Sequence, residues 1–78
     1  MQRIGTLIRN FRLKNRLSQT ELAFLINIPS QSKISSWESG NSLPDILEAQ
    51  RLARIFGLSL DDFINAEIPQ SNDLNHKV

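Results

Sequence analysis

Apolar residues recur at helical spacing along most of the chain up to about residue 65. Near the N-terminus they occupy positions i, i+3, i+4 and i+7, which lie on one face of an α-helix. These positions are Ile4, Leu7, Ile8 and Phe11. The stripe predicts a first helix over about residues 2–14.

A helix-start signal follows between Leu17 and Leu22. Ser18 can cap the first turn, and Glu21 can accept a hydrogen bond from the Ser18 backbone in return. Leu17 can pack on Leu22 across this start. Asn27 tolerates the left-handed conformation that commonly ends helices, so the pattern predicts a second helix of about two turns.

A third short helix is predicted after the proline in the turn. Pro29 cannot continue a helix, which makes Ser30 the natural cap of the next one. Ile34 and Trp37 form the apolar side of this helix. Gly40 is placed to end it.

A fourth helix is predicted from Asp45 to Gly57. Asp45 and Glu48 have the spacing of a capping box, and Gly57 marks the end. The residues expected to face inward are Ile46, Ala49, Leu52, Ala53 and Phe56. Leu47 is also expected in the core.

Ser59 repeats the start signal, with an acidic residue, Asp62, three positions later. The sequence therefore predicts five short helices, no strand and an all-α fold. Residues 66–78 lose the apolar periodicity and gather polar residues, which is typical of a disordered tail. We expect one folded domain over residues 1–65.

Composition narrows the class of protein. With 78 residues, 40% of them hydrophobic, the chain has room for one small domain, in which a deep substrate cavity would compete with the core. It contains no cysteine and one histidine, His76. We therefore expect no disulfide, no metal site and no cofactor. Because no long apolar run is present, we expect a cytoplasmic protein without a membrane span.

The net charge of +1 hides an uneven distribution. Residues 1–16 contain five basic residues and no acidic one, whereas residues 58–78 contain four acidic residues and one basic residue. One cationic face would follow if this asymmetry persisted in the fold. Such asymmetry is often ordinary surface variation, and its sign alone does not decide for a polyanionic partner.

The second and third predicted helices flank a short turn, as in the helix-turn-helix arrangement that places its second helix in the DNA major groove. Opposite Ile34 and Trp37, one side of the third helix carries Gln31, Ser32, Ser35 and Ser36. The Gln31 amide can pair with adenine, and serine hydroxyls can contact bases or phosphates. A solvated polar face would show the same pattern, and the helix alone leaves both interpretations open.

Several segments, in the same order, resemble the Cro and phage-repressor type of helix-turn-helix family, also called the XRE type. Residues 17–23, LSQTELA, resemble the helix-two signature of that family, and residues 34–40, ISSWESG, resemble its helix-three ending. Pro44 and residues 52–61 resemble its fourth and fifth helices, so that the similarity spans about residues 4–64. The resemblance implies a compact five-helix, lambda-repressor-like DNA-binding domain.

The resemblance also implies which residues hold the motif together. Ala23 is the small residue that lets the second and third helices approach closely, and Ile34 belongs to the core. Arg12 and Glu38 match a pair that forms a salt bridge between the first helix and the end of the third.

For DNA binding, the resemblance implies that Gln19 contacts a phosphate and supports Gln31. The positions of Ser32 and Ser36 face bases. Those of Ser30, Lys33 and Ser39 border the phosphate backbone. The full candidate set is Ser18, Gln19, Ser30, Gln31, Ser32, Lys33, Ser35, Ser36, Ser39 and Asn41.

The chain departs from the family pattern at two places. The spacing from Ala23 to Ile34 is one residue longer than usual, and we place the extra residue at Pro29. Residues 41–44, NSLP, lack the Lys or Arg that relatives often use there to grip phosphate. We therefore expect modest affinity, or affinity that depends on dimer formation, and a shallow dependence on salt.

These features imply sequence-specific binding of double-stranded DNA by a homodimer that acts as a transcriptional repressor. We expect the protein to be prokaryotic or phage-encoded and associated with the nucleoid. For Ile55 and Ile64 the sequence leaves two locations open, the core or an exposed dimer surface. The alternative is an antitoxin or other protein-interaction module, in which residues 66–78 order on a toxin. An enzyme has the least support, because no base stands near Ser35 or Ser36.

Overall fold

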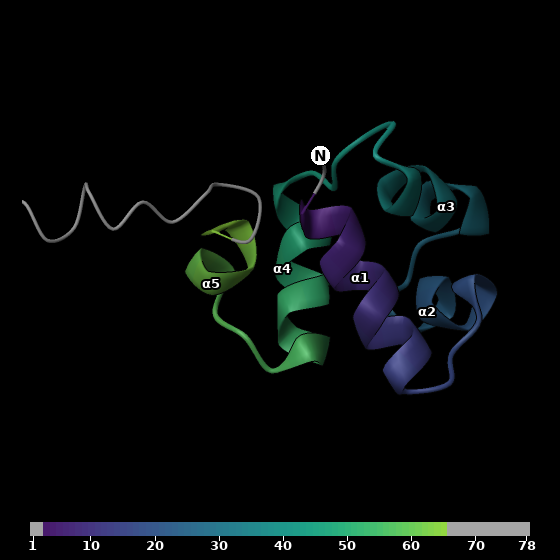
Figure 1. Ribbon diagram of the computed structural model, residues 1–78, viewed down its shortest axis with the longest axis horizontal. Coiled ribbons are helices and arrows are strands. Elements are labelled where there is room, and N and C mark those ends of the chain that lie inside the picture. The colour runs from purple at the N-terminus through teal and green to yellow at the C-terminus, as the bar shows by residue number, and fades with distance from the viewer. Residues whose placement is uncertain (1–2, 66–78) are drawn as a thin grey trace, which may run out of the picture.

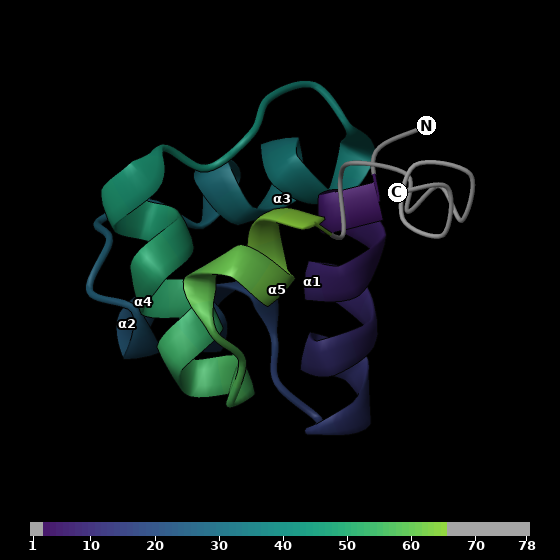
Figure 2. The ribbon, with the colours of Figure 1, turned by 90° about the vertical axis from the view of Figure 1, so that its left-hand side faces the viewer.

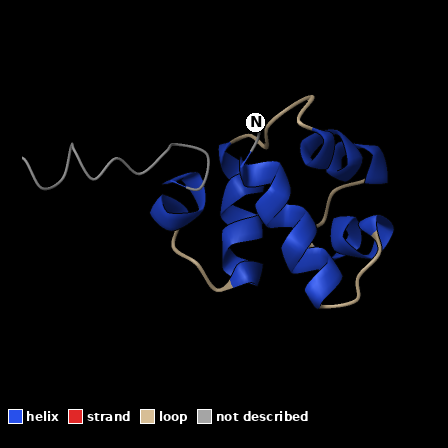
Figure 3. Cartoon of the chain, viewed as in Figure 1, coloured by secondary structure: helices blue, strands red, loops and turns tan. Residues whose placement is uncertain are grey.

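Five α-helices follow one another through residues 3–65, the part of the chain that the computed structural model describes (Figure 1, Figure 3). Their bounds are α1 Arg3–Lys14, α2 Gln19–Leu25, α3 Gln31–Ser39, α4 Ile46–Phe56 and α5 Leu60–Asn65. These residues contain no strand, so the predicted all-α class is confirmed. None of their helices is long and apolar enough to cross a membrane. The predicted tail, residues 66–78, lies outside the described residues.

Four of the helices begin at the caps that the sequence predicts, which are Ser18, Ser30, Asp45 and Ser59. Each cap side chain accepts a hydrogen bond from a backbone N–H in the first turn, where the helix itself offers no partner. At Ser18 and Asp45 a glutamate three residues later also accepts from the cap backbone, which completes the capping box.

The first four helices end alike, with one residue in the left-handed conformation. These residues are Arg16, Asn27, Gly40 and Gly57. After each of them, the next backbone N–H donates to the carbonyl five residues back, as in the Schellman motif; Ile28 N, for example, lies 3.0 Å from Ala23 O. The ends at Asn27, Gly40 and Gly57 agree with prediction. The left-handed Arg16 was missed, because arginine has no preference for this conformation.

Every helix contributes one completely buried side chain to a common core. These side chains are Ile8, Leu22, Ile34, Leu52 and Phe63. Burial of each contributes about 1.5–3 kcal/mol relative to exposure. The rings of Phe11 and Phe56 stack with centroids 4.0 Å apart and join α1 to α4. In the ribbon, α3 packs against α1 and α2, and α5 packs against α4 (Figure 2).

Helices α1 and α3 approach closely at Gly5. A Cβ atom at this position would lie 2.3 Å from the carbonyl oxygen of Trp37, which is closer than real Cβ contacts allow. The apolar stripe did not single out Gly5, because the need for a small residue arises only from a helix more than thirty positions away along the chain.

Two residues expected in the core are exposed instead. Ile46 is 77% exposed and Leu47 is 53% exposed, so both predictions are wrong. Ile46 is the first residue of α4, and side chains tilt toward the N-terminus of their helix, which carries this one past the covered turn. Leu47 lies about 140° around the helix from the buried Leu52. Of the two open positions, Ile55 is half-buried and Ile64 is exposed.

Candidate nucleic-acid interface

The turn between α2 and α3 is held at both ends. Asn27 adopts a left-handed φ of 59° at its start, and Ser30 caps α3 at its finish. From α4, Arg51 Nη1 donates to Ile26 O at 3.3 Å and to Asn27 O at 3.4 Å. Sequence reasoning missed Arg51, because no local signal links it to a turn about 25 residues away. Pro29 lies within this turn, and α3 begins at Gln31.

A chain of polar contacts runs from α1 through the end of α3 and α2 to the first residue of α3. Arg12 Nε donates to Glu38 Oε2 at 2.7 Å, and Arg12 Nη2 donates to Glu38 Oε1 at 3.0 Å. Gln19 Nε2 donates to the same Glu38 Oε1 at 3.2 Å. Gln31 Nε2 then donates to Gln19 Oε1 at 2.6 Å. The expected salt bridge and the expected support of Gln31 by Gln19 are therefore both present.

The Glu38 carboxylate determines which group donates and which accepts in this series of hydrogen bonds. Its side chain is only 4% exposed, and its hydrogen bond to Arg12 raises the pKa of the Arg12 guanidinium. An ionised carboxylate only accepts, so Gln19 must turn its NH2 toward Glu38 and its oxygen toward Gln31. Gln31 thereby keeps Oε1 and one N–H free, the pair of groups that bidentate recognition of adenine requires.

The serines of the candidate set differ in the hydrogen bonds that their hydroxyls already form. Ser30 Oγ and Ser32 Oγ lie 2.5 Å apart at the start of α3, beside the exposed Gln31. Ser36 Oγ lies 2.7 Å from Ser42 Oγ in the following loop. Ser39 Oγ donates to the carbonyl of Ser36 at 3.0 Å. Ser32 is exposed and directly follows Gln31 in α3.

The remaining members of the set take several positions. Ser18 serves as the cap of α2, Ser35 is half-buried on α3, and Asn41 is exposed just after α3. The structure thus brings Gln19, Gln31 and the serines around the N-terminus of α3 together, whereas Asn41 lies beyond the other end of that helix.

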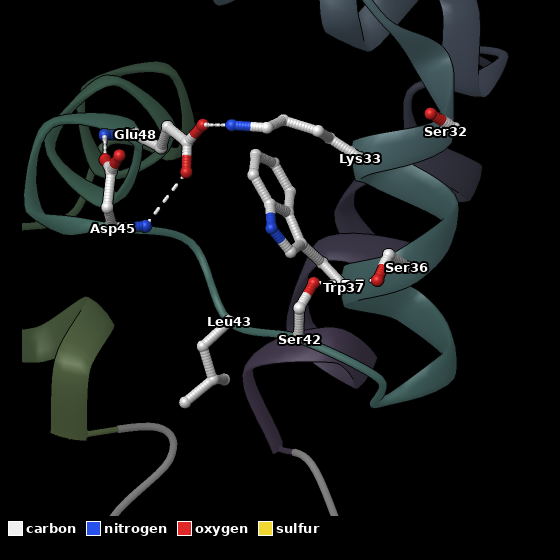
Figure 4. A pocket seen from close by; sticks show the side chains of 8 residues that line it. All are labelled: Ser32, Lys33, Ser36, Trp37, Ser42, Leu43, Asp45 and Glu48. Atoms are coloured by element: carbon white, nitrogen blue, oxygen red, sulfur yellow. Dashed lines mark hydrogen bonds and ion pairs between the residues drawn. The ribbon is translucent and has the colours of Figure 1, made fainter.

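Lys33 forms an ion pair that the sequence did not predict. Its Nζ donates to Glu48 Oε2 on α4, and this hydrogen bond raises the pKa of Lys33. Figure 4 shows the lysine extending from α3 across a cleft that Trp37 also lines, to meet Glu48 on the far side. Within residues 3–65, no group of three or more His, Cys, Asp or Glu side chains is placed to hold a metal ion.

Two apolar surfaces remain open on the described part of the molecule. On α2, Phe24 is 82% exposed and borders a groove with Leu17 and Leu25. At the start of α4, exposed Ile46 lines a second groove, whose other exposed apolar side chains are Leu43 and Ile64. We call the first the α2 surface and the second the α4–α5 surface. Neither includes the exposed Gln31.

A family model described as helix-turn-helix matches residues 8–63, which include α2, α3 and α4 completely and the larger parts of α1 and α5. Comparison with curated proteins gives no match. Comparison with solved structures gives none either. The matched region covers well over half of the 78 residues.

Proposed function

Because this chain belongs to the XRE-type helix-turn-helix family, we propose that it binds double-stranded DNA sequence-specifically as a homodimer and represses transcription. The family is one of DNA-binding regulators rather than enzymes. The observation that carries the proposal is the oriented Gln31 amide at the start of α3, supported through Gln19 by the buried Glu38. If it acts on DNA in this way, we expect the protein in the cytoplasm, at the nucleoid.

The binding surface follows from the exposed side of α3. Gln31 and Ser32 contact base edges, with Ser35 and Ser36 along the same helix. Phosphates lie against Gln19, Ser30, Lys33 and Ser39, with Ser18 and Asn41 at the two margins. The cap of α3 and its first turn also present backbone N–H groups to phosphate.

The proposal is tested by selecting bound duplexes from a random pool with the purified protein, and by repeating the selection with Gln31→Ala. We expect one enriched site, and we expect the alanine variant to lose discrimination at one base pair of each half-site, worth about 1–3 kcal/mol. Gln19→Ala should weaken the same preference less, because Gln31 keeps its own contacting groups.

Selection that enriches no duplex over bulk at moderate salt would rule out sequence-specific binding. An enriched site whose base preference survived both substitutions would show that the assignment of Gln31 is wrong. Gln31→Ala should fold normally, since Gln31 is exposed and its removal leaves no buried group unpaired. In Gln19→Ala, the Glu38 carboxylate keeps both hydrogen bonds from Arg12.

A second candidate function is that of an antitoxin or similar protein-interaction module. The α2 surface favours it, because Phe24 is a large aromatic side chain left open beside an apolar groove. In this alternative, a partner protein covers Phe24 and Leu25. Phe24→Glu would then abolish binding of that partner while leaving DNA binding intact.

A further inference from the structure

One ion pair connects α3 to the beginning of α4. Lys33 Nζ donates to Glu48 Oε2, and the two side chains differ in exposure: that of Lys33 is 51% exposed and that of Glu48 is 10% exposed. The lysine therefore stands at the surface beside the proposed DNA-contacting face. The glutamate that holds it is largely covered.

The position of Glu48 is set independently of Lys33. Glu48 is the third residue of α4, and its Oε1 accepts from Asp45 N at 2.9 Å in the capping box. Its own backbone N donates to Asp45 Oδ1 at 2.8 Å. With one carboxylate oxygen committed to the start of α4, the other points across the cleft toward Lys33 (Figure 4).

Removal of Lys33 from this pair would leave a largely buried carboxylate oxygen without its charged partner. Such a loss is costly, because a largely buried carboxylate is poorly hydrated and would lose its opposite charge. A DNA phosphate that attracts Lys33 must offset this cost. The carboxylates of Asp45 and Glu48 at the start of α4 also repel an approaching anion.

We propose that Glu48 competes with DNA phosphates for Lys33 and thereby lowers the affinity of the domain for DNA. This inference rests on the proposed DNA-binding function. Four other cations of the described chain, Arg9, Lys14, Arg16 and Arg54, are exposed and form no ion pair within residues 3–65. Lys33 thus adds less to phosphate binding than its place on α3 suggests.

The test is Glu48→Gln, measured as the dependence of duplex affinity on salt. Glutamine can keep the capping box, since it also accepts from the cap backbone, but it no longer holds the lysine by charge. One added phosphate contact should steepen the slope of log K against log salt by about 0.9. This corresponds to a loss of affinity between about 50 and 200 mM salt that is roughly threefold larger than in the wild type.

Glu21→Gln is the matched control. Glu21 holds the same third position in the capping box of α2 and accepts from Ser18 N at 2.7 Å, but it has no lysine partner. Its substitution removes the same charge and should leave the salt slope unchanged. In a Lys33→Met background, Glu48→Gln should also leave the slope unchanged, and thermal unfolding checks that all variants fold.

Equal slopes for Glu48→Gln and Glu21→Gln would overturn the inference, as would a steeper slope that persists in the Lys33→Met background. The salt slope is measurable on any duplex, so the result does not depend on finding a preferred site. Failure of the wild type to bind any duplex would instead contradict the proposed function itself.

Discussion

At the scale of single residues, a carboxylate and a guanidinium decide how an amide at the surface is oriented. Arg12 neutralises Glu38, Glu38 orients Gln19, and Gln19 orients Gln31. Arg12 also donates to Leu17 O at 2.9 Å, which attaches the segment that leads into α2. The Arg12–Glu38 ion pair therefore stabilises the fold and also orients Gln31, the side chain proposed to contact bases.

We predict that Arg12→Met lowers the free energy of unfolding by about 3 kcal/mol, because it leaves the Glu38 charge buried without compensation. The double variant Arg12→Met with Glu38→Gln should recover much of this loss, since it removes the buried charge as well. Urea denaturation of the three proteins measures both effects. A loss below about 1 kcal/mol in the single variant, or no recovery in the double variant, would contradict the prediction.

At the scale of helices, local signals set the ends and close contacts set the packing. Caps and left-handed residues lie at the predicted boundaries of α2, α3 and α4, because each involves atoms only a few residues apart. The crossing of α1 and α3 depends on atoms far apart in the chain. It requires that Gly5 carry no side chain beneath the Trp37 carbonyl.

We predict that Gly5→Ala destabilises the fold by about 1–3 kcal/mol, the usual cost of overpacking a close contact, although alanine is the better helix former. The added Cβ meets backbone, which cannot rotate away as a side chain could. The control is Asn10→Ala at an exposed position of the same helix, which should change stability by no more than roughly 0.5 kcal/mol. Thermal and urea unfolding provide the comparison. A Gly5→Ala protein at least as stable as the wild type would show that α1 and α3 are not in close contact here.

At the scale of the whole molecule, the exposed apolar surfaces bear on assembly. A single small module offers little area for tight DNA binding, and two-fold dimers bind half-sites about one helical turn apart. The α4–α5 surface supports the proposed dimer, because Ile46 and Ile64 are exposed around one groove while Gln31 lies on neither apolar surface. The α2 surface would then be available to the partner protein of the alternative function.

We predict that Ile46→Glu weakens self-association at least tenfold and weakens binding to a two-half-site duplex, without lowering stability, since Ile46 is 77% exposed. Phe24→Glu, on the other surface, should leave both properties unchanged. Sedimentation at several concentrations, with and without the selected duplex, provides the measurement. A wild-type protein that stays one-to-one on a single half-site would contradict the dimer, and dimer loss in Phe24→Glu alone would move the interface to α2.

The candidate site was partly predictable, but from a family resemblance rather than from the local signals that predicted the helices. The pairing of Arg12 with Glu38 and of Gln19 with Gln31 followed from a resemblance to a family and is present. The ion pair of Lys33 with Glu48 and the contact of Arg51 with the turn did not follow. Both depend on where α4 lies relative to α3 and α2, which no short-range signal encodes.

The sequence by itself determined the all-α class, the caps and most of the helix ends, because each depends on interactions within about five residues. It also determined which polar residues share a face of α3. Only the tertiary structure decided that Gly5 must be small, that Ile46 and Leu47 are exposed, and that Lys33 faces a glutamate. These features depend on whether helices far apart in the sequence contact or cover one another, and the periodicity of apolar residues does not specify such contacts.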